Sequence, residues 1–263
     1  MSPACVSLLT DFGLHDTYVG VMHGVLARLA PEARVIDLSH DVPPQDVRTA
    51  AFFWEQALPY FPPGVVHLAV VDPGVGTARA ILLARRPEGV LIAPDNGLLA
   101  PFAADAELFR FEAWERALPD RATTFDGRDV FSPIAACVAQ GVPLEALGSP
   151  IAREAIAPLA RAAPRDLGGG TWEGEVIHVD RFGNLITNLP SSLPVASLTV
   201  GGATIEGPAA AGYGEREPGA TMVIAGSSRR LEVSVNRGSA ARALAVHRGA
   251  TVLLCVNPRQ SHP

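Results

Sequence analysis

The chain has 263 residues and a formal net charge of −6, with 48% hydrophobic and 18% charged residues. This length allows one large domain or two small ones, each with a substantial core. Binding to nucleic acid or an anionic membrane requires clustered basic side chains, which this mildly acidic chain lacks, so we expect neither partner. All 21 basic residues are arginine. The composition therefore excludes a Schiff-base lysine, a pyridoxal-phosphate lysine and a P-loop lysine.

The cysteines and the apolar runs indicate in which cellular compartment the protein is expected. Cys5, Cys137 and Cys255 are far apart and form no CxxC pair. We interpret them as buried small hydrophobic residues in a reducing compartment. No apolar run reaches the roughly 18 residues of a membrane helix. The first residues show neither the basic region nor the cleavage site of a signal peptide. We therefore expect a cytoplasmic protein.

Strand and helix patterns alternate through the first part of the chain. Apolar runs predict strands at residues 6–10, 34–38, 65–71, 81–85 and 90–93. Helical periodicity predicts helices at residues 16–30, 45–60 and 128–140. Apolar runs without alternation are typical of strands that are buried on both faces. We predict an α/β N-terminal domain at residues 1–164 with a mostly parallel sheet.

The pattern changes near residue 164, where PRDLGGG (164–170) predicts a linker. Short strand patterns follow, separated by Gly and Pro, at residues 173–179, 185–189, 197–200, 221–225, 231–235 and 251–256. Such a series of short strands is typical of a small barrel or sandwich. We predict a small all-β C-terminal barrel at residues 171–263.

Three aspartates each follow a predicted strand, namely Asp11, Asp72 and Asp95. In an open parallel sheet, ligands bind in the crevice outside the carboxyl ends of the strands. Carboxylates there could bind hydroxyls, an amine or a cation. One Asp beside Gly or Asn is adequately explained as a turn residue. Three at the same edge, with glycines that let a ligand approach the backbone, favour a binding site.

Other short matches carry no functional meaning. Residues 11–13 read DFG, but the strand lysine and HRD loop of a kinase are missing. GVG at residues 74–76 leads into a strand rather than the helix of a dinucleotide fingerprint. The seven histidines show no HxH or HExxH spacing. We interpret His67 as a core residue and His40 with Asp41 as a loop pair, and we expect no metal site.

Several motifs together resemble one known family over nearly the whole chain. They are TDFGLHDTYVG (10–20), IDLSHDV (36–42), VVDPGVGT (70–77) with Arg79, APDNGLL (93–99), DRFGN (180–184) and SVNRGSA (234–240). In this order they resemble the S-adenosyl-L-methionine (SAM) hydroxide adenosyltransferases, relatives of the fluorinases and chlorinases. The resemblance implies an α/β domain, a β-barrel and a homotrimer with sites between subunits. It also implies hydrolysis of SAM to adenosine and L-methionine without a metal or an organic cofactor.

The resemblance implies contacts to the nucleoside part of SAM. Asp11 matches the ribose-binding Asp, a role that suits a carboxylate because it can accept two hydrogen bonds from a cis-diol. Asn184 matches an adenine contact, and Phe182 would pack beside it. Without the family, residues 180–184 would be interpreted as a β-turn.

The methionine part is assigned in the same way. Asp180 matches the Asp that pairs with the methionine amine, and Ser228 and Arg229 resemble the pair that holds the methionine carboxylate. Without the family, Arg229 would be interpreted as a solvated strand residue.

The nucleophile site departs from the family pattern at one position. Hydroxide-using members share an Asp, Arg and His set near the reacting water, and Asp72 and Arg79 match the first two. In TFDGRD (124–129), Asp126 stands where the family has His before Gly. An aspartate ordinarily has a pKa of about 4 and is a weaker base than imidazole. Asp126 therefore takes the water-orienting role, slows the reaction or marks a different nucleophile.

The halide-using branch is the neighbouring alternative. The fluorinase pattern has Trp, Tyr, Thr and Ser where this chain has Gln45, Asp72, Val75 and Gly127. The carboxylates of Asp72 and Asp126 would repel a halide. The sequence therefore favours water as the nucleophile.

Two further classes stay open. A binding module would keep Asp11 and Asp180 and hold SAM or adenosine without turnover. A metal-dependent hydrolase would use Asp11, Asp72 and Asp95, and would lose activity in EDTA.

Overall fold

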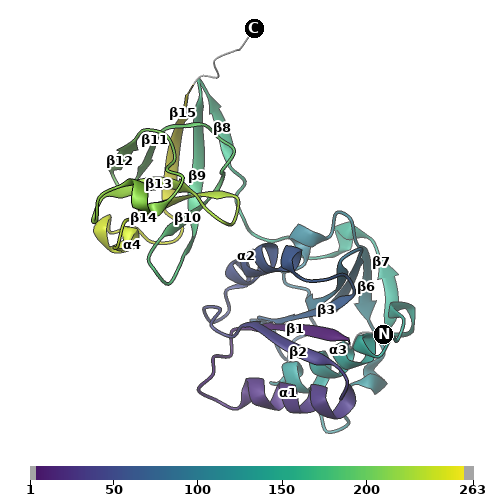
Figure 1. Cartoon of the computed structure of the whole chain (residues 1–263). Helices are drawn as coiled ribbons and strands as arrows, with labels where there is room; N and C mark the ends of the chain where they lie inside the picture. The colour runs from purple at the N-terminus through teal and green to yellow at the C-terminus, as the bar shows by residue number, and fades with distance from the viewer. Residues whose placement is uncertain (1–3, 258–263) are drawn as a thin grey trace. The chain divides into compact units, whose positions relative to one another are not determined.

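A computed structural model describes residues 4–257 of the chain (Figure 1). The chain divides into two compact units, residues 1–160 and 161–263. Within residues 4–257, none of the helices has the length and apolar character needed to cross a membrane.

The N-terminal unit is built on a seven-stranded sheet of order β2-β1-β3-β5-β4-β6-β7. Its strands are β1 (Cys5–Thr10), β2 (Arg34–Ser39), β3 (Val65–Val70), β4 (Ile81–Arg86), β5 (Gly89–Pro94), β6 (Glu107–Phe111) and β7 (Gly148–Ile151). From β2 to β5 the neighbours pair in parallel. From β5 to β7 they pair antiparallel. The sheet is therefore mixed, and the expected mostly parallel sheet is not confirmed.

The connection between β4 and β5 explains this difference. Only Pro87 and Glu88 separate the two strands. A parallel connection needs a crossover of about a dozen residues or more, whereas two residues suffice for an antiparallel hairpin. The sequence pattern predicts both strands but not β6 or β7, which complete the antiparallel half.

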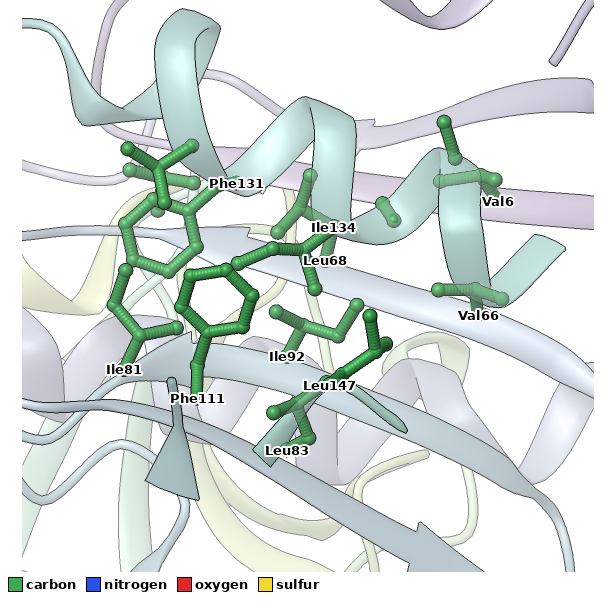
Figure 2. Packing of buried hydrophobic residues seen from close by; sticks show 14 of the residues in the cluster. Val6, Val66, Leu68, Ile81, Leu83, Ile92, Phe111, Phe131, Ile134 and Leu147 are labelled. Atoms are coloured by element: carbon green, nitrogen blue, oxygen red, sulfur yellow. The ribbon is translucent and has the colours of Figure 1, made fainter. Parts of the chain in front are cut away.

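Helices cover both faces of this sheet (Figure 1). α1 (Tyr18–Leu29) and α3 (Ser132–Ala139) pack on one face, and α2 (Val47–Ala57) packs on the other. On β3, Val66 and Leu68 face the first core, whereas Ala69 faces the second. Figure 2 shows part of the first core, in which Leu68 lies beside Ile134 of α3. Burial on both faces confirms the interpretation of the unbroken apolar runs.

The helix ends follow local chemistry. α2 begins after Asp46, whose Oδ1 accepts a hydrogen bond from the Thr49 N–H at 3.1 Å. The helix expected at residues 128–140 instead starts with a π-helical turn, η4 (Gly127–Phe131), followed by α3. Pro133 has no N–H that could donate to the Asp129 carbonyl as in a regular helix, and this carbonyl instead accepts a hydrogen bond from the Leu118 N–H at 2.8 Å.

Further short helical turns are η1 (Leu58–Tyr60), η2 (Ala100–Phe102), η3 (Trp114–Arg116), η5 (Leu144–Ala146), η6 (Arg153–Ala155) and η7 (Tyr213–Glu215).

The C-terminal unit is an antiparallel sheet that nearly closes into a barrel. The strand order is β12-β11-β15-β9-β10-β14-β13, and β8 pairs with β9. The strands are β8 (Arg165–Gly168), β9 (Thr171–Val179), β10 (Leu185–Pro190), β11 (Val195–Val200), β12 (Ala203–Glu206), β13 (Thr221–Ala225), β14 (Arg230–Val235) and β15 (Thr251–Val256), with α4 (Ala240–Ala243) after β14. The segment expected to be a linker thus contains β8. All four residues of β8 are exposed, so no apolar pattern marks the strand.

Two interpretations of single residues are tested by burial. His67 lies in the core as expected, is 1% exposed, and has its pKa lowered to about 4 by burial. The three cysteines are free thiols; Cys5 and Cys137 are half-buried rather than buried as expected, and this partial burial raises their pKa. Cys255 is exposed, because alternation along β15 turns it outward, so its expected burial is wrong.

Candidate active site

A cavity of about 580 Å³ lies beside the carboxyl ends of β1 and β3. Asp11 directly follows β1, and Asp72 lies two residues beyond the end of β3. The cavity is lined by the carboxylates Asp11, Asp72 and Asp126, by the aromatic rings Phe12, Tyr18 and Phe125, and by loop residues that include Pro44, Gln45, Val75 and Gly127. The position agrees with the rule that ligands bind at the carboxyl ends of parallel strands.

Arg79 joins two of these carboxylates. Its Nε donates to Asp72 Oδ2 at 2.8 Å, and its Nη2 donates to the same oxygen and to Asp126 Oδ2, the latter at 2.5 Å. The side chains of Arg79, Asp72 and Asp126 are only 10%, 4% and 15% exposed. Burial by itself would lower the pKa of Arg79, but its bonds to the two carboxylates outweigh burial and raise that pKa. The guanidinium therefore stays charged.

A tight loop returns Arg79 to Asp72. Asp72 Oδ1 accepts a hydrogen bond from the Gly74 N–H at 3.1 Å, and the Thr77 N–H donates to the Gly74 carbonyl at 3.1 Å. Gly76 has a φ of +78°, and a Cβ at this position would lie 2.8 Å from the Thr123 carbonyl oxygen. The glycines of the DPGVG segment thus serve the turn and its close packing.

The π-helical turn η4 positions Asp126, which immediately precedes it. Asp129 within this turn is buried, and its carboxylate accepts bonds from the Ala122 N–H at 2.8 Å and from Arg128 Nε at 2.6 Å. A Cβ on Gly127 would lie 3.2 Å from Phe12 Cε2. Such turns are frequent at functional sites, and helical periodicity in the sequence did not predict this one.

Asp11 is fixed by the loop that follows β2. Its Oδ2 accepts a hydrogen bond from the Gln45 N–H at 2.7 Å, and Gln45 has a φ of +65°. The pKa of Asp11 is raised, mainly by burial and also by the negative charge of Asp72, against the lowering effect of the Gln45 N–H. A non-glycine residue in this conformation is uncommon and often lies at a binding site.

Three aromatic rings form an apolar wall of the cavity. The centroids of Phe12 and Phe125 are 5.9 Å apart, and those of Tyr18 and Phe125 are 5.1 Å apart. The guanidinium of Arg128 lies 5.1 Å from the centroid of Phe125. Sequence reasoning did not single out these rings, although all three belong to the quoted segments. They offer a surface for a planar ligand group.

Asp95 does not join the other carboxylates. Its Oδ1 accepts a hydrogen bond from the Ala157 N–H at 2.8 Å, and it is not among the residues that line the cavity. The neighbouring Asn96 donates to the Val71 carbonyl at 2.8 Å. The third carboxylate of the cavity is Asp126, so the expected convergence of Asp95 with Asp11 and Asp72 is wrong.

In the C-terminal unit, residues 180–184 form a tight turn. Asp180 Oδ1 accepts bonds from the Phe182 and Asn184 N–H groups, each at 2.9 Å, and Asp180 Oδ2 accepts one from Asn184 Nδ2 at 2.8 Å. Gly183 has a φ of +85°, and a Cβ there would lie 2.0 Å from Ser239 Oγ. Phe182 is 75% exposed. Phe182 and Asn184 line a second cavity of about 520 Å³.

Ser228 and Arg229 lie in the turn between β13 and β14. Ser228 Oγ donates to Glu232 Oε1 at 3.4 Å, and Arg229 has a φ of +58°. Arg229 is thus a turn residue and not a strand residue. Burial and the negative charge of Asp180 raise the pKa of Glu232, which is 6% exposed. Glu232 was not predicted as a site residue, because the sequence of β14 does not show that the carboxylate of Asp180 lies near it.

Two family models match the chain in this arrangement. The SAM hydroxide adenosyltransferase N-terminal domain matches residues 6–148, and the C-terminal domain of the same family matches residues 174–253. The chain belongs to the SAM hydroxide adenosyltransferase family. The resemblance seen in the sequence is therefore confirmed. Each of the two matched family domains falls within one compact unit of the chain.

Individual relatives place the chain within the SAM hydroxide adenosyltransferase family. It is 44% identical over 262 residues to a protein of Thermus thermophilus named (R)-S-adenosyl-L-methionine hydrolase, covering 95% of this chain and 98% of the relative. A fluorinase of an Actinoplanes species is 27% identical over 213 residues, or 70% of this chain and 71% of the fluorinase. The solved structure of an uncharacterized conserved protein from Thermotoga maritima matches with a TM-score of 0.88 and 34% identity, covering 95% and 99% of the two chains.

Proposed function

We propose that this protein hydrolyses SAM to adenosine and L-methionine by attack of water on the ribose C5′. The observation that carries the proposal is the pair of carboxylates Asp72 and Asp126, which line the N-terminal cavity and are both bonded to Arg79. The proposal is also supported by the 44% identity of this chain to a relative that is named an (R)-SAM hydrolase.

The chemistry makes modest demands on the protein. The sulfonium of SAM is a good leaving group, so no acid is needed at the sulfur. The water oxygen forms a bond to C5′ as the C5′–S bond breaks. The electron pair of the C5′–S bond stays with the sulfur of methionine, and the attacking water releases one proton. The protein must hold this water in line with the C5′–S bond and exclude competing water.

The buried carboxylates suit that task. Asp72 and Asp126 can accept hydrogen bonds from one water molecule, and Arg79 fixes the position of both. We assign to Asp126 the water-orienting role of the family His, because Asp126 lines the cavity and contacts the same guanidinium as Asp72.

A halide nucleophile suits the cavity less well. Two carboxylates would repel an anion, and each has low exposure to solvent that could screen its charge. The Ser of the fluorinase pattern at position 127 would place its Cβ 3.2 Å from the ring of Phe12. The more distant identity to the fluorinase, 27%, agrees with this choice.

The remaining groups are proposed to bind the substrate. Asp11 would accept bonds from the ribose diol, and the aromatic wall would pack against the nucleoside. In the C-terminal unit, Asp180 would pair with the methionine amine. The other proposed contacts there are Phe182, Asn184, Ser228 and Arg229.

A metal-dependent hydrolase has less support. Among residues 4–257, Asp11, Asp72 and Asp95 do not form a group that could share one ion. Asp72 is paired with Arg79, and Asp95 binds a backbone N–H outside the cavity. We therefore propose no metal or organic cofactor for the hydrolysis.

We further propose a cytoplasmic homotrimer in which each site is completed by the neighbouring subunit, and no nucleic-acid or membrane partner. The water site and Asp11 belong to the N-terminal unit, whereas the proposed methionine contacts belong to the C-terminal unit. Sedimentation equilibrium of the purified protein is expected to give three times the chain mass. A monomer that is fully active would contradict the shared site.

Isotope labelling tests the reaction. We expect EDTA-treated protein, incubated with SAM in H₂¹⁸O, to form adenosine that carries ¹⁸O at the 5′ position, at a rate that chloride does not change. Chromatography with mass detection follows the nucleosides. SAM binding without adenosine would support the binding module, and 5′-chloroadenosine would support the halide branch. Activity that is lost in EDTA and restored by a metal would contradict a reaction that proceeds without a metal.

A further inference from the structure

Three metal-ligating side chains meet outside the cavity described above. His23 lies on α1, Asp37 lies on β2, and His40 follows β2. His23 Nε2 is 2.8 Å from Asp37 Oδ1, and His40 Nε2 is 3.1 Å from the same oxygen. One ligand atom from each residue lies within 4.8 Å of the other two. None of the three lines the 580 Å³ cavity.

The His40 side chain is the most informative member of this group. It is 3% exposed, and its Nδ1 lies 2.8 Å from Thr10 Oγ1. Its Nε2 faces Asp37, but it is buried without a hydrogen-bond partner. The tautomer in which Nδ1–H donates to Thr10 has a lone pair on Nε2, and a metal-binding imidazole is held by an outer contact in this way. His40 lies in the loop after β2, as expected, but its side chain is buried rather than solvated.

We propose that His23, Asp37 and His40 bind one divalent transition-metal ion, with Zn²⁺ as the best fit. Two imidazole nitrogens and one carboxylate oxygen are typical zinc ligands, whereas Ca²⁺ and Mg²⁺ prefer oxygen. Metal–ligand bonds of about 2.0–2.2 Å in a tetrahedron place the ligand atoms roughly 3.3 Å apart. The two distances to Asp37 Oδ1 therefore need to lengthen by only a few tenths of an ångström.

The exposure of the group agrees with metal exchange from solution. The side chains of His23 and Asp37 are 36% and 42% exposed, whereas His40 forms the buried side of the group. An ion can therefore enter from solvent, and a water molecule can occupy its fourth position. The ligands are 14 and 3 residues apart in the sequence, which matches no metal motif and explains why the histidine spacing did not reveal them.

The bound ion would brace the segment that carries Asp11. Thr10 Oγ1 contacts His40 and also accepts a bond from the Phe12 N–H at 3.3 Å, and the His40 carbonyl accepts a bond from the Gly13 N–H at 2.8 Å. The ion would link α1 and β2 to this segment without touching the substrate. Its role is structural, and the site does not depend on the proposed hydrolysis.

Metal binding to the untagged full-length protein tests the site. After EDTA treatment and removal of the chelator, calorimetry is expected to show one equivalent of Zn²⁺ bound per chain. Co²⁺ is expected to give the visible absorption of a tetrahedral N- and O-ligated ion. Zn²⁺ is also expected to raise the Tm in a concentration-dependent way, because it binds the folded chain.

Variants at the two exposed ligands locate the ion while sparing buried His40. His23→Gln and Asp37→Asn are each expected to lower Zn²⁺ affinity by more than the roughly 10- to 100-fold that follows loss of an outer contact. They should also abolish the Co²⁺ absorption. His247→Gln, at an exposed histidine of the C-terminal unit, is the matched control and should bind like the wild type. Equal Zn²⁺ affinity in all four proteins, or no Zn²⁺ binding and no change in Tm for the wild type, would overturn the proposal.

Discussion

Replacing Asp72 by Ala is expected to lower kcat for SAM hydrolysis by about a hundredfold or more, with a much smaller change in KM. The carboxylate is 4% exposed, and Arg79 holds it in the cavity wall. Its proposed hydrogen bond to the attacking water matters most as the water gains positive charge in the transition state. Steady-state kinetics measure kcat and KM separately.

Arg79→Ala is expected to lower kcat in the same way, because both carboxylates lose their common partner. Glu107→Ala is the matched control. It removes a carboxylate that pairs with Arg85 at 2.6 Å, but that pair is well exposed and neither residue lines the cavity. Circular dichroism checks that each variant is folded. Unchanged turnover in folded Asp72→Ala and Arg79→Ala would rule out the assigned water site.

Replacing Asp11 by Ala is expected to weaken substrate binding roughly 10- to 100-fold, because two hydrogen bonds to a charged acceptor are lost. The effect on kcat should be smaller. Calorimetric titration with adenosine measures the binding step without turnover. Asp16→Ala, at an exposed position of the same loop, is the control. Equal adenosine affinity of the wild type and of folded Asp11→Ala would contradict the proposed role of Asp11 in binding the ribose.

The raised pKa of Asp11 adds a pH dependence to this result. Burial is the main cause of the shift, and it disfavours the charged carboxylate. Protonation of Asp11 removes an acceptor for the diol, so binding should weaken as the pH falls through this pKa. Because the pKa is raised, the loss should begin at a higher pH than for an ordinary aspartate. Asp11→Asn should bind weakly at every pH and lack this step.

The fold was predictable where local pattern and packing agree. The unbroken apolar runs of β1 and β3 identified strands that are buried on both faces, and the helical periods identified α1 and α2. The relative direction of neighbouring strands was not predictable in this way, because a strand that is buried on both faces has the same apolar pattern in a parallel and an antiparallel pair. The two-residue connection between β4 and β5 was the available signal for the mixed sheet.

The site was predictable in part from strand ends. Asp11 and Asp72 line the cavity, as the end of a parallel strand suggests, but Asp95 turns to a backbone N–H instead. Arg79 and Asp126 came from the family resemblance, and the structure brings both to Asp72. Asp126 and Arg79 are 47 residues apart, and no local pattern relates them.

The order and types of the amino acids were enough to exclude lysine chemistry, to predict the regular elements of most of the chain and to indicate membership of the family. These depend on composition, on periodicity and on ordered motifs. The folded chain was needed to show that Arg79 pairs with two carboxylates and that His23 and His40 both contact Asp37 Oδ1. No local pattern predicts these contacts, because they join residues from different strands, helices and loops. Their meeting depends on strand order and on the backbone course of each turn, which long-range packing sets.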